Sequence, residues 1–215
     1  MDSAATDAKP PREAILDAAE QVMRENGYAA VTSRRVAAVA GLKAQLVHYY
    51  FQSMDELFLE VFRRLAREIL ARQDEAEHAD KPLRAMWDLL SDSRYRILIY
   101  EFVALGNHRK QVGTEFFQFG DELREKQVKL MRTALKRRGQ TDFPWSPEFA
   151  AILLHALSRF LSLEAELGVS AGHANAIAVV NYYLDLYDRP ESSLERRCRE
   201  LEAENADLRA QLKKG

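Results

Sequence analysis

The chain has 215 residues, of which 47% are hydrophobic and 30% are charged, so it can bury a substantial core and is not disordered as a whole. No apolar run approaches the roughly 18 residues that cross a bilayer, which excludes a membrane-spanning helix. The net charge is −2, and the one cysteine, Cys198, excludes an internal disulfide and a zinc site built from several thiolates. The first ten residues contain no apolar stretch, so we expect no signal peptide, no membrane partner and a cytoplasmic location.

Apolar residues recur at helical spacing along nearly the whole chain, without the alternation of a strand, and this pattern predicts an all-α fold. The first helix follows Pro10-Pro11, and its apolar stripe stops at Asn26-Gly27. Glycine after the last apolar turn is a typical end signal of a helix. Residues 1–10 are therefore predicted to be a disordered tail before this helix.

Two short helices joined by a tight turn are predicted over residues 32–50. Thr32 or Ser33 caps the first of them, and Gly41 ends it by adopting a positive φ that only glycine adopts at low cost. The second runs from about Ala44 to Tyr50. Two such helices around a glycine-containing turn form a helix-turn-helix.

The segment that contains these two helices is locally basic. It has no acidic residue between Glu25 and Asp55, whereas Arg34, Arg35 and Lys43 lie within it. The outward positions carry hydrogen-bond donors suited to phosphate oxygens and base edges, namely Ser33, Arg34, Lys43, Gln45, His48 and Tyr49. An unspecialised helical hairpin is the alternative, but the absence of acids and the three rings of residues 48–50 favour double-stranded DNA as the partner.

The rest of the chain is predicted to form further helices. A capping box at Ser53–Glu56 opens a fourth helix that reaches roughly Ala76. The next helices are predicted near Pro82–Ser93, Arg94–Asn107, Gly113–Arg138, Pro147–Leu167 and His173–Tyr187, with a loop over Gly139–Trp145. Asp188-Arg189-Pro190 then breaks the chain before a charged helix from Ser192 onward.

The last helix has the heptad pattern of a short coiled coil. Leu194, Leu201 and Leu208 recur every seven residues at position d, and Cys198 and Asn205 fall at position a. In a parallel dimer the g and e positions would pair Arg197 with Glu202 and Glu204 with Arg209 of the other chain, both opposite in sign. A solvated single helix is the alternative, because the Glu/Arg/Ala-rich composition also supports one.

The N-terminal motifs resemble the TetR family of transcriptional regulators. The resemblance lies in ENGY, VTSRRVAAVAG, LVHYYF and QSMDELF and covers roughly residues 11–60. It implies a homodimeric repressor with an Ω shape, in which Thr32, Ser33 and Arg34 touch phosphates, Lys43, Ala44 and Gln45 approach base edges, and His48, Tyr49 and Tyr50 contact bases or backbone. Ala44 and Met54 depart from lysines that are common in the family, so we expect a weaker salt dependence of binding.

The resemblance also implies a DNA-binding domain over residues 11–57 and a helical effector-binding and dimerisation domain over 58–190. The coil over 191–215, predicted from its heptads, departs from the compact plan of the family. The helices at 147–167 and 173–187 would form the four-helix bundle of the dimer, and the predicted dimerisation residues are Leu153, Leu157, Leu161, Val179, Tyr183, Leu194, Leu201, Asn205 and Leu208. The small-molecule effector is expected to be largely apolar. Its candidate contacts are Trp87, Tyr95, Glu101, Phe102, Phe116, Phe119 and His155.

Other classes of function fit the sequence less well. The five histidines form no i, i+4 metal pair, and neither a phosphate-binding glycine loop nor a nucleophile elbow is present, so no catalytic residue, metal or cofactor is predicted. The main alternative is a DNA-architectural or protein-interaction module without a ligand. Binding without sequence preference would favour that alternative over regulation.

Overall fold

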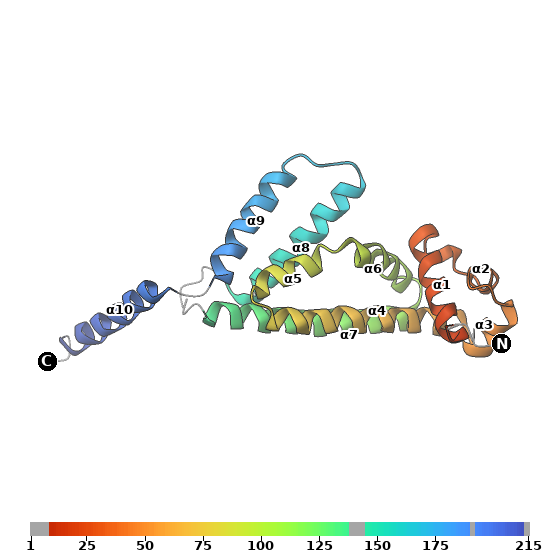
Figure 1. The fold of residues 1–215 in the computed structure, drawn as a ribbon, viewed down its shortest axis with the longest axis horizontal. Coiled ribbons are helices and arrows are strands. Elements are labelled where there is room, and N and C mark those ends of the chain that lie inside the picture. Colours follow the sequence, from red (N-terminus) through yellow and green to blue (C-terminus); the bar gives the residue numbers. More distant parts are fainter. Residues whose placement is uncertain (1–8, 138–144, 190–191, 213–215) are drawn as a thin grey trace, which may run out of the picture. The chain divides into compact units, whose positions relative to one another are not determined.

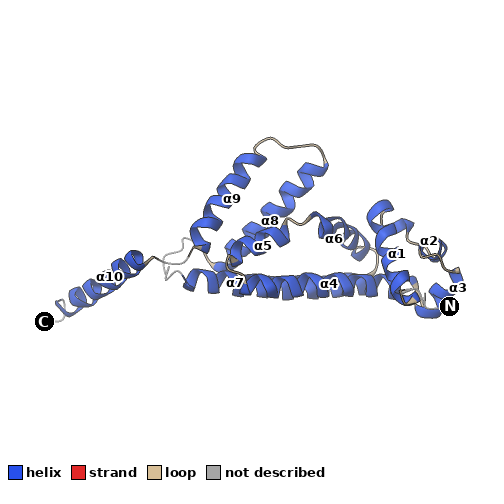
Figure 2. Ribbon diagram, in the orientation of Figure 1, coloured by secondary structure: helices blue, strands red, loops and turns tan. Residues whose placement is uncertain are grey.

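The computed structural model describes residues 9–137, 145–189 and 192–212, which form helices and no strand (Figure 2). The predicted all-α fold is confirmed. The chain divides into two compact units: unit 1 holds residues 1–72 and 91–123, and unit 2 holds residues 73–90 and 124–215. None of the described helices is both long enough and apolar enough to span a membrane.

The N-terminal elements of unit 1 lie where the sequence predicted them. They are α1 (Pro11–Asn26), a 3-10 turn η1 (Tyr28–Ala30), α2 (Ser33–Val39) and α3 (Ala44–Tyr50) (Figure 1). Gly27 follows α1 with a φ of +78°, as expected for a residue that ends a helix. The capping box differs in one detail: Ser53 Oγ accepts the N–H of Glu56, but the Glu56 carboxylate accepts the N–H of Gln52.

The remaining helices are shifted by a few residues from the prediction. They are α4 (Met54–His78), α5 (Pro82–Leu90), α6 (Ser93–Gly106), α7 (Lys110–Arg137), α8 (Pro147–Glu166), α9 (His173–Asp188) and α10 (Ser193–Leu212). The largest differences are the earlier end of α5 and the earlier start of α7. The Asp92 side chain accepts the N–H of Arg94 and so fixes the first turn of α6, a cap that the sequence analysis missed. The predicted Gly139–Trp145 loop lies, except for Trp145, outside the described residues.

The core of unit 1 joins the first helices to parts of α4, α6 and α7. Ile15, Val22 and Met23 of α1 are fully buried. A group of four phenylalanines continues this core, because the Phe62 ring lies 5.1 to 5.6 Å from the rings of Phe102, Phe116 and Phe119. The contacts of Phe62 with the other three rings stabilise the packing of α4, α6 and α7 within this unit.

The core of unit 2 is apolar and includes Met86 and Trp87 of α5, Leu130 and Met131 of α7, and Leu184 of α9. The end of α9 is fixed to the start of α5 by Asp188, whose two carboxylate oxygens accept the N–H groups of Leu83 and Arg84 at 2.9 and 2.7 Å. Asp188 thus serves as an N-cap supplied by a distant helix. Burial raises its pKa, while the two backbone hydrogen bonds lower it.

Candidate DNA-binding surface

The turn between α2 and α3 is closed by backbone hydrogen bonds. Thr32 Oγ1 accepts the N–H of Arg35 at the start of α2, as the cap prediction requires. Beyond α2, the N–H of Leu42 donates to the carbonyl of Ala37 at 2.9 Å, and Gly41 between them has a φ of +68°. Ala37 is buried where the chain folds back, so a larger side chain would separate the two helices. Gly41 in the turn and the small Ala37 side chain therefore set the angle between α2 and α3.

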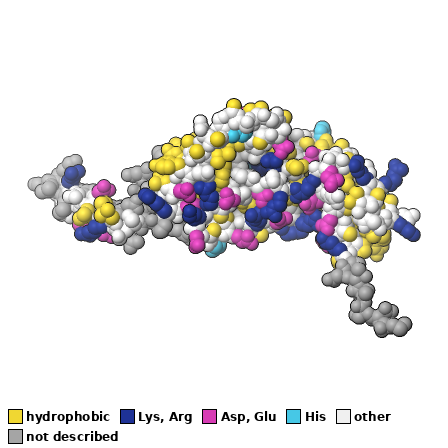
Figure 3. All heavy atoms as spheres, turned by 45° about the horizontal axis from the view of Figure 1, so that its top comes forward, with side chains coloured by type: hydrophobic (Ala, Val, Ile, Leu, Met, Phe, Trp, Pro, Cys, Tyr) yellow, Lys and Arg dark blue, Asp and Glu magenta, His cyan; other side chains and the backbone are white. Residues whose placement is uncertain are grey.

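Burial divides the helix-turn-helix into an inner and an outer face. Val36 of α2 and Val47 of α3 are buried in the core of unit 1. On the outer face lie the exposed side chains of Thr32, Arg34, Lys43, Gln45, His48 and Tyr49 and the half-buried side chains of Ser33, Ala44 and Tyr50. Basic side chains project from this end of unit 1 (Figure 3). All nine residues predicted to touch DNA therefore lie on or at the edge of one face.

The cations on this face differ in how they are held. Arg35 donates to the side-chain oxygen of Asn26 at 2.6 Å, which ties α2 to the end of α1. Arg34 and Lys43 make no ion pair with any described residue. Their charges are therefore available to an external anion such as phosphate. The Tyr49 ring, 78% exposed, packs edge-on against the ring of Tyr50 at 5.0 Å between centroids.

Ion pairs within unit 1 attach α1 to α4 behind the helix-turn-helix. Arg64 of α4 donates to Asp17 at 2.6 Å and to Glu20 at 2.7 Å, and Arg12 donates to Glu60 at 2.6 Å. Hydrogen bonds from Arg63 and Arg12 lower the pKa of Glu60, against the opposing effect of its partial burial. These pairs hold α1 in a defined position on α4, and the helix-turn-helix packs against α1.

A second attachment comes from α6, through Glu101. Its carboxylate accepts the N–H of Tyr28 at 2.6 Å and lies against Gly27, at the junction of α1 and η1. Glu101 is one of the residues predicted to contact an effector, and that contact stays a prediction. In the structure its carboxylate holds the helix-turn-helix segment to α6 within unit 1.

The other predicted effector residues are not brought together at one site. Tyr95, Phe102, Phe116 and Phe119 lie in unit 1, where three of them belong to the phenylalanine group and Tyr95 donates to Glu68 at 2.6 Å. Trp87 and His155 lie in unit 2. At the start of α6 in unit 1, hydrogen bonds from Arg94 hold the pKa of the N-cap residue Asp92 well below its usual range.

His155 is the predicted effector residue with the most strongly perturbed ionisation. Burial, followed by the charges of Arg159 and Arg124, lowers its pKa to about 4. Arg159 Nε donates to His155 Nε2 at 3.3 Å, so the proton of the neutral ring lies on Nδ1, which is 3.4 Å from Oε1 of Gln127. His155 is thus a neutral, donor-bearing group inside unit 2 at pH 7.

The predicted dimerisation residues occupy different environments. Leu157 and Leu161 pack against the core of unit 2, whereas Leu153, Val179 and Tyr183 are exposed. In α10, Leu194, Leu201 and Asn205 are exposed; the side chain of Leu208 lies outside the described part. Cys198, at the other a position of the proposed coil, is a free and exposed thiol.

Comparison with known proteins agrees with this architecture. Residues 15–61 match the family model described as bacterial regulatory proteins, tetR family. The HTH-type transcriptional repressor BepR of Brucella suis is 27% identical over 173 residues, which cover 73% of this chain and 81% of BepR. The HTH-type transcriptional regulator BetI of Agrobacterium fabrum is 40% identical over 58 residues, 27% of this chain but only 28% of BetI.

Solved structures share the fold over most of the chain. A putative transcriptional regulator from Saccharomonospora viridis in complex with choline has a TM-score of 0.67 and 20% identity over 82% of this chain and 94% of its own. A TetR transcription regulator from Haloarcula marismortui has a TM-score of 0.66 and 19% identity over 82% of this chain and 97% of its own.

An all-helical chain with an exposed, acid-free helix-turn-helix at its N-terminus is a DNA-binding protein of the helix-turn-helix class. The family match identifies it further. Residues 15–61 carry the N-terminal domain of the TetR family of transcriptional regulators, and beyond it the chain is similar to a transcriptional repressor that carries the same class of DNA-binding domain.

Proposed function

We propose that this regulator is a repressor that binds a palindromic operator as a homodimer and leaves it when a small effector binds to unit 2. The observation that carries the proposal is the outer face of α2 and α3, where Arg34 and Lys43 have no partner in the part of the chain that the structure describes. The name of the relative BepR, a transcriptional repressor, supports the sign of regulation. A two-fold symmetric dimer implies an operator with two matching half-sites.

The partner for the dimer is a second copy of the same chain. Apolar side chains of α8 and α9 are exposed, among them Phe160 at 57% and Val179 at 56% (Figure 3). Monomeric proteins rarely expose so many large apolar groups on two neighbouring helices. We assign this surface, together with α10, to dimerisation; in α10 the exposed Leu194 and Leu201 lie on one helical stripe.

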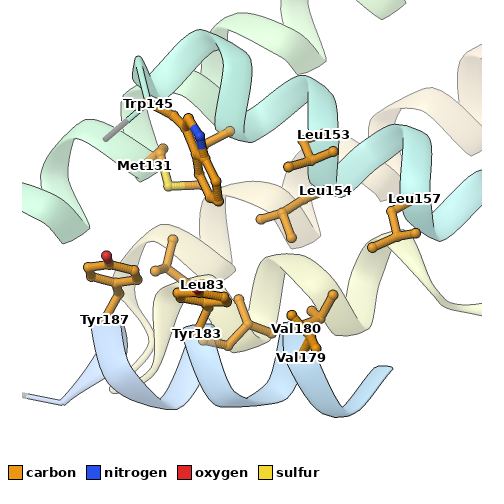
Figure 4. Close-up of a pocket in the computed structure, with 12 residues that line it drawn as sticks. Leu83, Met131, Trp145, Leu153, Leu154, Leu157, Val179, Val180, Tyr183 and Tyr187 are labelled. Carbon is orange, nitrogen blue, oxygen red and sulfur yellow. The ribbon is translucent and has the colours of Figure 1, made fainter. Parts of the chain in front are cut away.

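The effector would bind in unit 2, which contains an apolar pocket of about 150 Å³. Leu153, Leu154 and Leu157 of α8 line one side, facing Val179 and Tyr183 of α9 on the other (Figure 4). Leu153, Val179 and Tyr183 are also predicted dimerisation residues, so the proposed pocket adjoins the proposed interface. A mostly apolar pocket is the usual form of a small-molecule site. Its chemistry supports the expectation of an effector that is at least partly apolar.

Selection of bound sites from random double-stranded DNA by the full chain tests this function. We expect a defined site of two inverted half-sites. Arg34→Ala should weaken binding to selected and random DNA alike and reduce the salt slope by about one for each half-site. Gln45→Ala should instead relax the preference at one position of each half-site, at a cost of about 1–3 kcal/mol.

Arg132→Ala provides the matched control, because Arg132 is an exposed arginine of unit 2 that pairs with Glu148. It should leave DNA binding unchanged. If the selection yields no common sequence, or if Gln45→Ala weakens binding to selected and random DNA equally, as Arg34→Ala is expected to do, the assignment of these residues is wrong and the architectural function is favoured.

A further inference from the structure

A layer of polar side chains crosses the interior of unit 2 beside its apolar core. Gln73 of α4 is 1% exposed and Gln127 of α7 is 0% exposed. Both amide atoms of Gln73, Nε2 of Gln127 and Nη1 of Arg124 are buried and have no hydrogen-bond partner among the described residues. Buried polar groups are almost always paired, so four unpaired atoms in one region need an explanation.

Contacts between the helices place these groups at one level. Asp74 pairs with Lys126 and Glu77 with Lys129, so α4 and α7 run parallel in unit 2 with a constant offset of 52 residues. This offset puts Gln73 level with the stretch of α7 that carries the other two groups. His155 of α8 reaches the same level through its contact with Gln127.

The free hydrogen-bonding capacity of this layer is mainly that of donors. Arg124 Nη1 and the amide nitrogens of Gln73 and Gln127 offer N–H groups, whereas Oε1 of Gln73 is the one unpaired acceptor among the described buried atoms of the layer. Of the acidic residues of α4 at this level, Asp74 and Glu77 are paired with lysines of α7, and Glu75 is exposed. A charged donor set with no carboxylate among its described buried members is complementary to an anion.

The apolar pocket lies in the same unit and shares two helices, α7 and α8, with this layer. Met131, which lines the pocket, is one turn beyond Gln127 on the same face of α7, and the pocket residue Leu154 precedes His155 on α8. A pocket of about 150 Å³ holds an apolar group about the size of benzene. The unit therefore offers a polar end and an apolar end to one molecule.

We propose that the effector is a small organic carboxylate, whose carboxylate is bound by Arg124, Gln73 and Gln127 and whose compact apolar body fills the pocket between α8 and α9. A carboxylate matches a single unpaired guanidinium in charge and shape better than a phosphate monoester, which carries nearly two charges. The inference specifies the ligand of the proposed repressor and therefore rests on the proposed function.

Calorimetry on the full chain, without DNA, tests the inference with acetate, hexanoate, phenylacetate and 3-phenylpropanoate and the neutral amide of each. We expect 3-phenylpropanoate to bind at least tenfold more tightly than 3-phenylpropanamide. Arg124→Gln should abolish this preference and Arg124→Lys should keep part of it. Arg132→Gln, an exposed arginine on the same helix, should leave the preference unchanged.

A second variant does not depend on the arginine. Gln73→Leu replaces an unpaired buried amide, so it should raise the melting temperature of the ligand-free chain while weakening the binding of 3-phenylpropanoate. A group with only a structural role would not produce these opposite effects.

Three results would overturn the inference: no binding of any of the four carboxylates, equal affinity for carboxylate and amide, or a carboxylate preference that survives Arg124→Gln. Tighter binding of phenyl phosphate than of phenylacetate would also overturn it. An operator complex that only neutral compounds release would leave the proposed function intact and refute the carboxylate. Failure to select any operator would refute the function, whatever the calorimetry shows.

Discussion

His155 should make the stability of unit 2 depend on pH. Its pKa in the folded protein is about 4, because burial and the charges of Arg159 and Arg124 disfavour the imidazolium, whereas an exposed histidine in the unfolded chain has a pKa of about 6.5. As the pH falls below 6.5, the unfolded chain takes up a proton that the folded chain does not. Stability is therefore complete above pH 6.5 and is lost progressively as the pH falls towards 4.

The difference between the two pKa values sets the size of the effect. At pH 5, protonation of His155 in the unfolded chain lowers the free energy of unfolding by about 2 kcal/mol. Below pH 4 the full decrease in the free energy of unfolding is about 3 kcal/mol. His155→Gln removes the titration and keeps an amide in a position to contact Gln127. The free energy of unfolding should therefore fall about 2 kcal/mol less in the variant than in the wild type between pH 7.5 and pH 5.

Urea unfolding followed by tryptophan fluorescence suits this measurement, because both tryptophans, Trp87 and Trp145, lie in the unit that contains His155. All other ionisable groups are the same in the two proteins, so the comparison between them isolates His155. Equal pH dependence in the two proteins, or an NMR titration that gives His155 a pKa near 6.5, would refute the argument from burial.

Three further changes test other parts of the molecule. Asp188→Ala should lower the free energy of unfolding of unit 2 by about 1–2 kcal/mol in the same urea assay, because two N–H groups at the start of α5 lose their acceptor; an unchanged midpoint would contradict the cap. Val179→Glu should give monomers in analytical ultracentrifugation with unaltered circular dichroism, and a persistent dimer would place the interface elsewhere. Mild oxidation should link two chains through Cys198 at a rate independent of protein concentration if α10 pairs within one dimer, whereas a rate that rises with concentration would indicate contacts between dimers.

Local signals made the N-terminal fold predictable from the sequence. Thr32 as a cap, Gly41 as a turn residue and Gly27 as a helix end act through the backbone of their immediate neighbours, and all three occur in the structure as expected. The start of α6 was missed by one residue, because Asp92 is also compatible with a loop and only its hydrogen bond to Arg94 shows that it is a cap.

Contacts between helices were less predictable than their positions in the chain. Helical spacing indicates which face of α6 carries Glu101, but not that η1 lies opposite, so a link to Tyr28 was interpreted as a ligand contact. Similarly, Phe102 and Phe116 belong to an aromatic stripe that is compatible with either a core or a pocket. The structure places both beside Phe62, in the core of unit 1.

The polar layer of unit 2 did leave a signal in the sequence. Gln73 lies four residues after Ile69 and three before Ala76, and Gln127 lies three before Leu130, so both amides interrupt apolar stripes that are buried in the structure. Such an interruption identifies a buried polar residue only once the stripe is known to face the core.

The polar layer of unit 2 lowers the stability of that unit. An unpaired polar group in a protein interior costs about 1–3 kcal/mol, so Gln73 and Gln127 weaken unit 2 in the ligand-free state. A ligand that supplies the missing acceptors removes this cost and stabilises the conformation to which it binds.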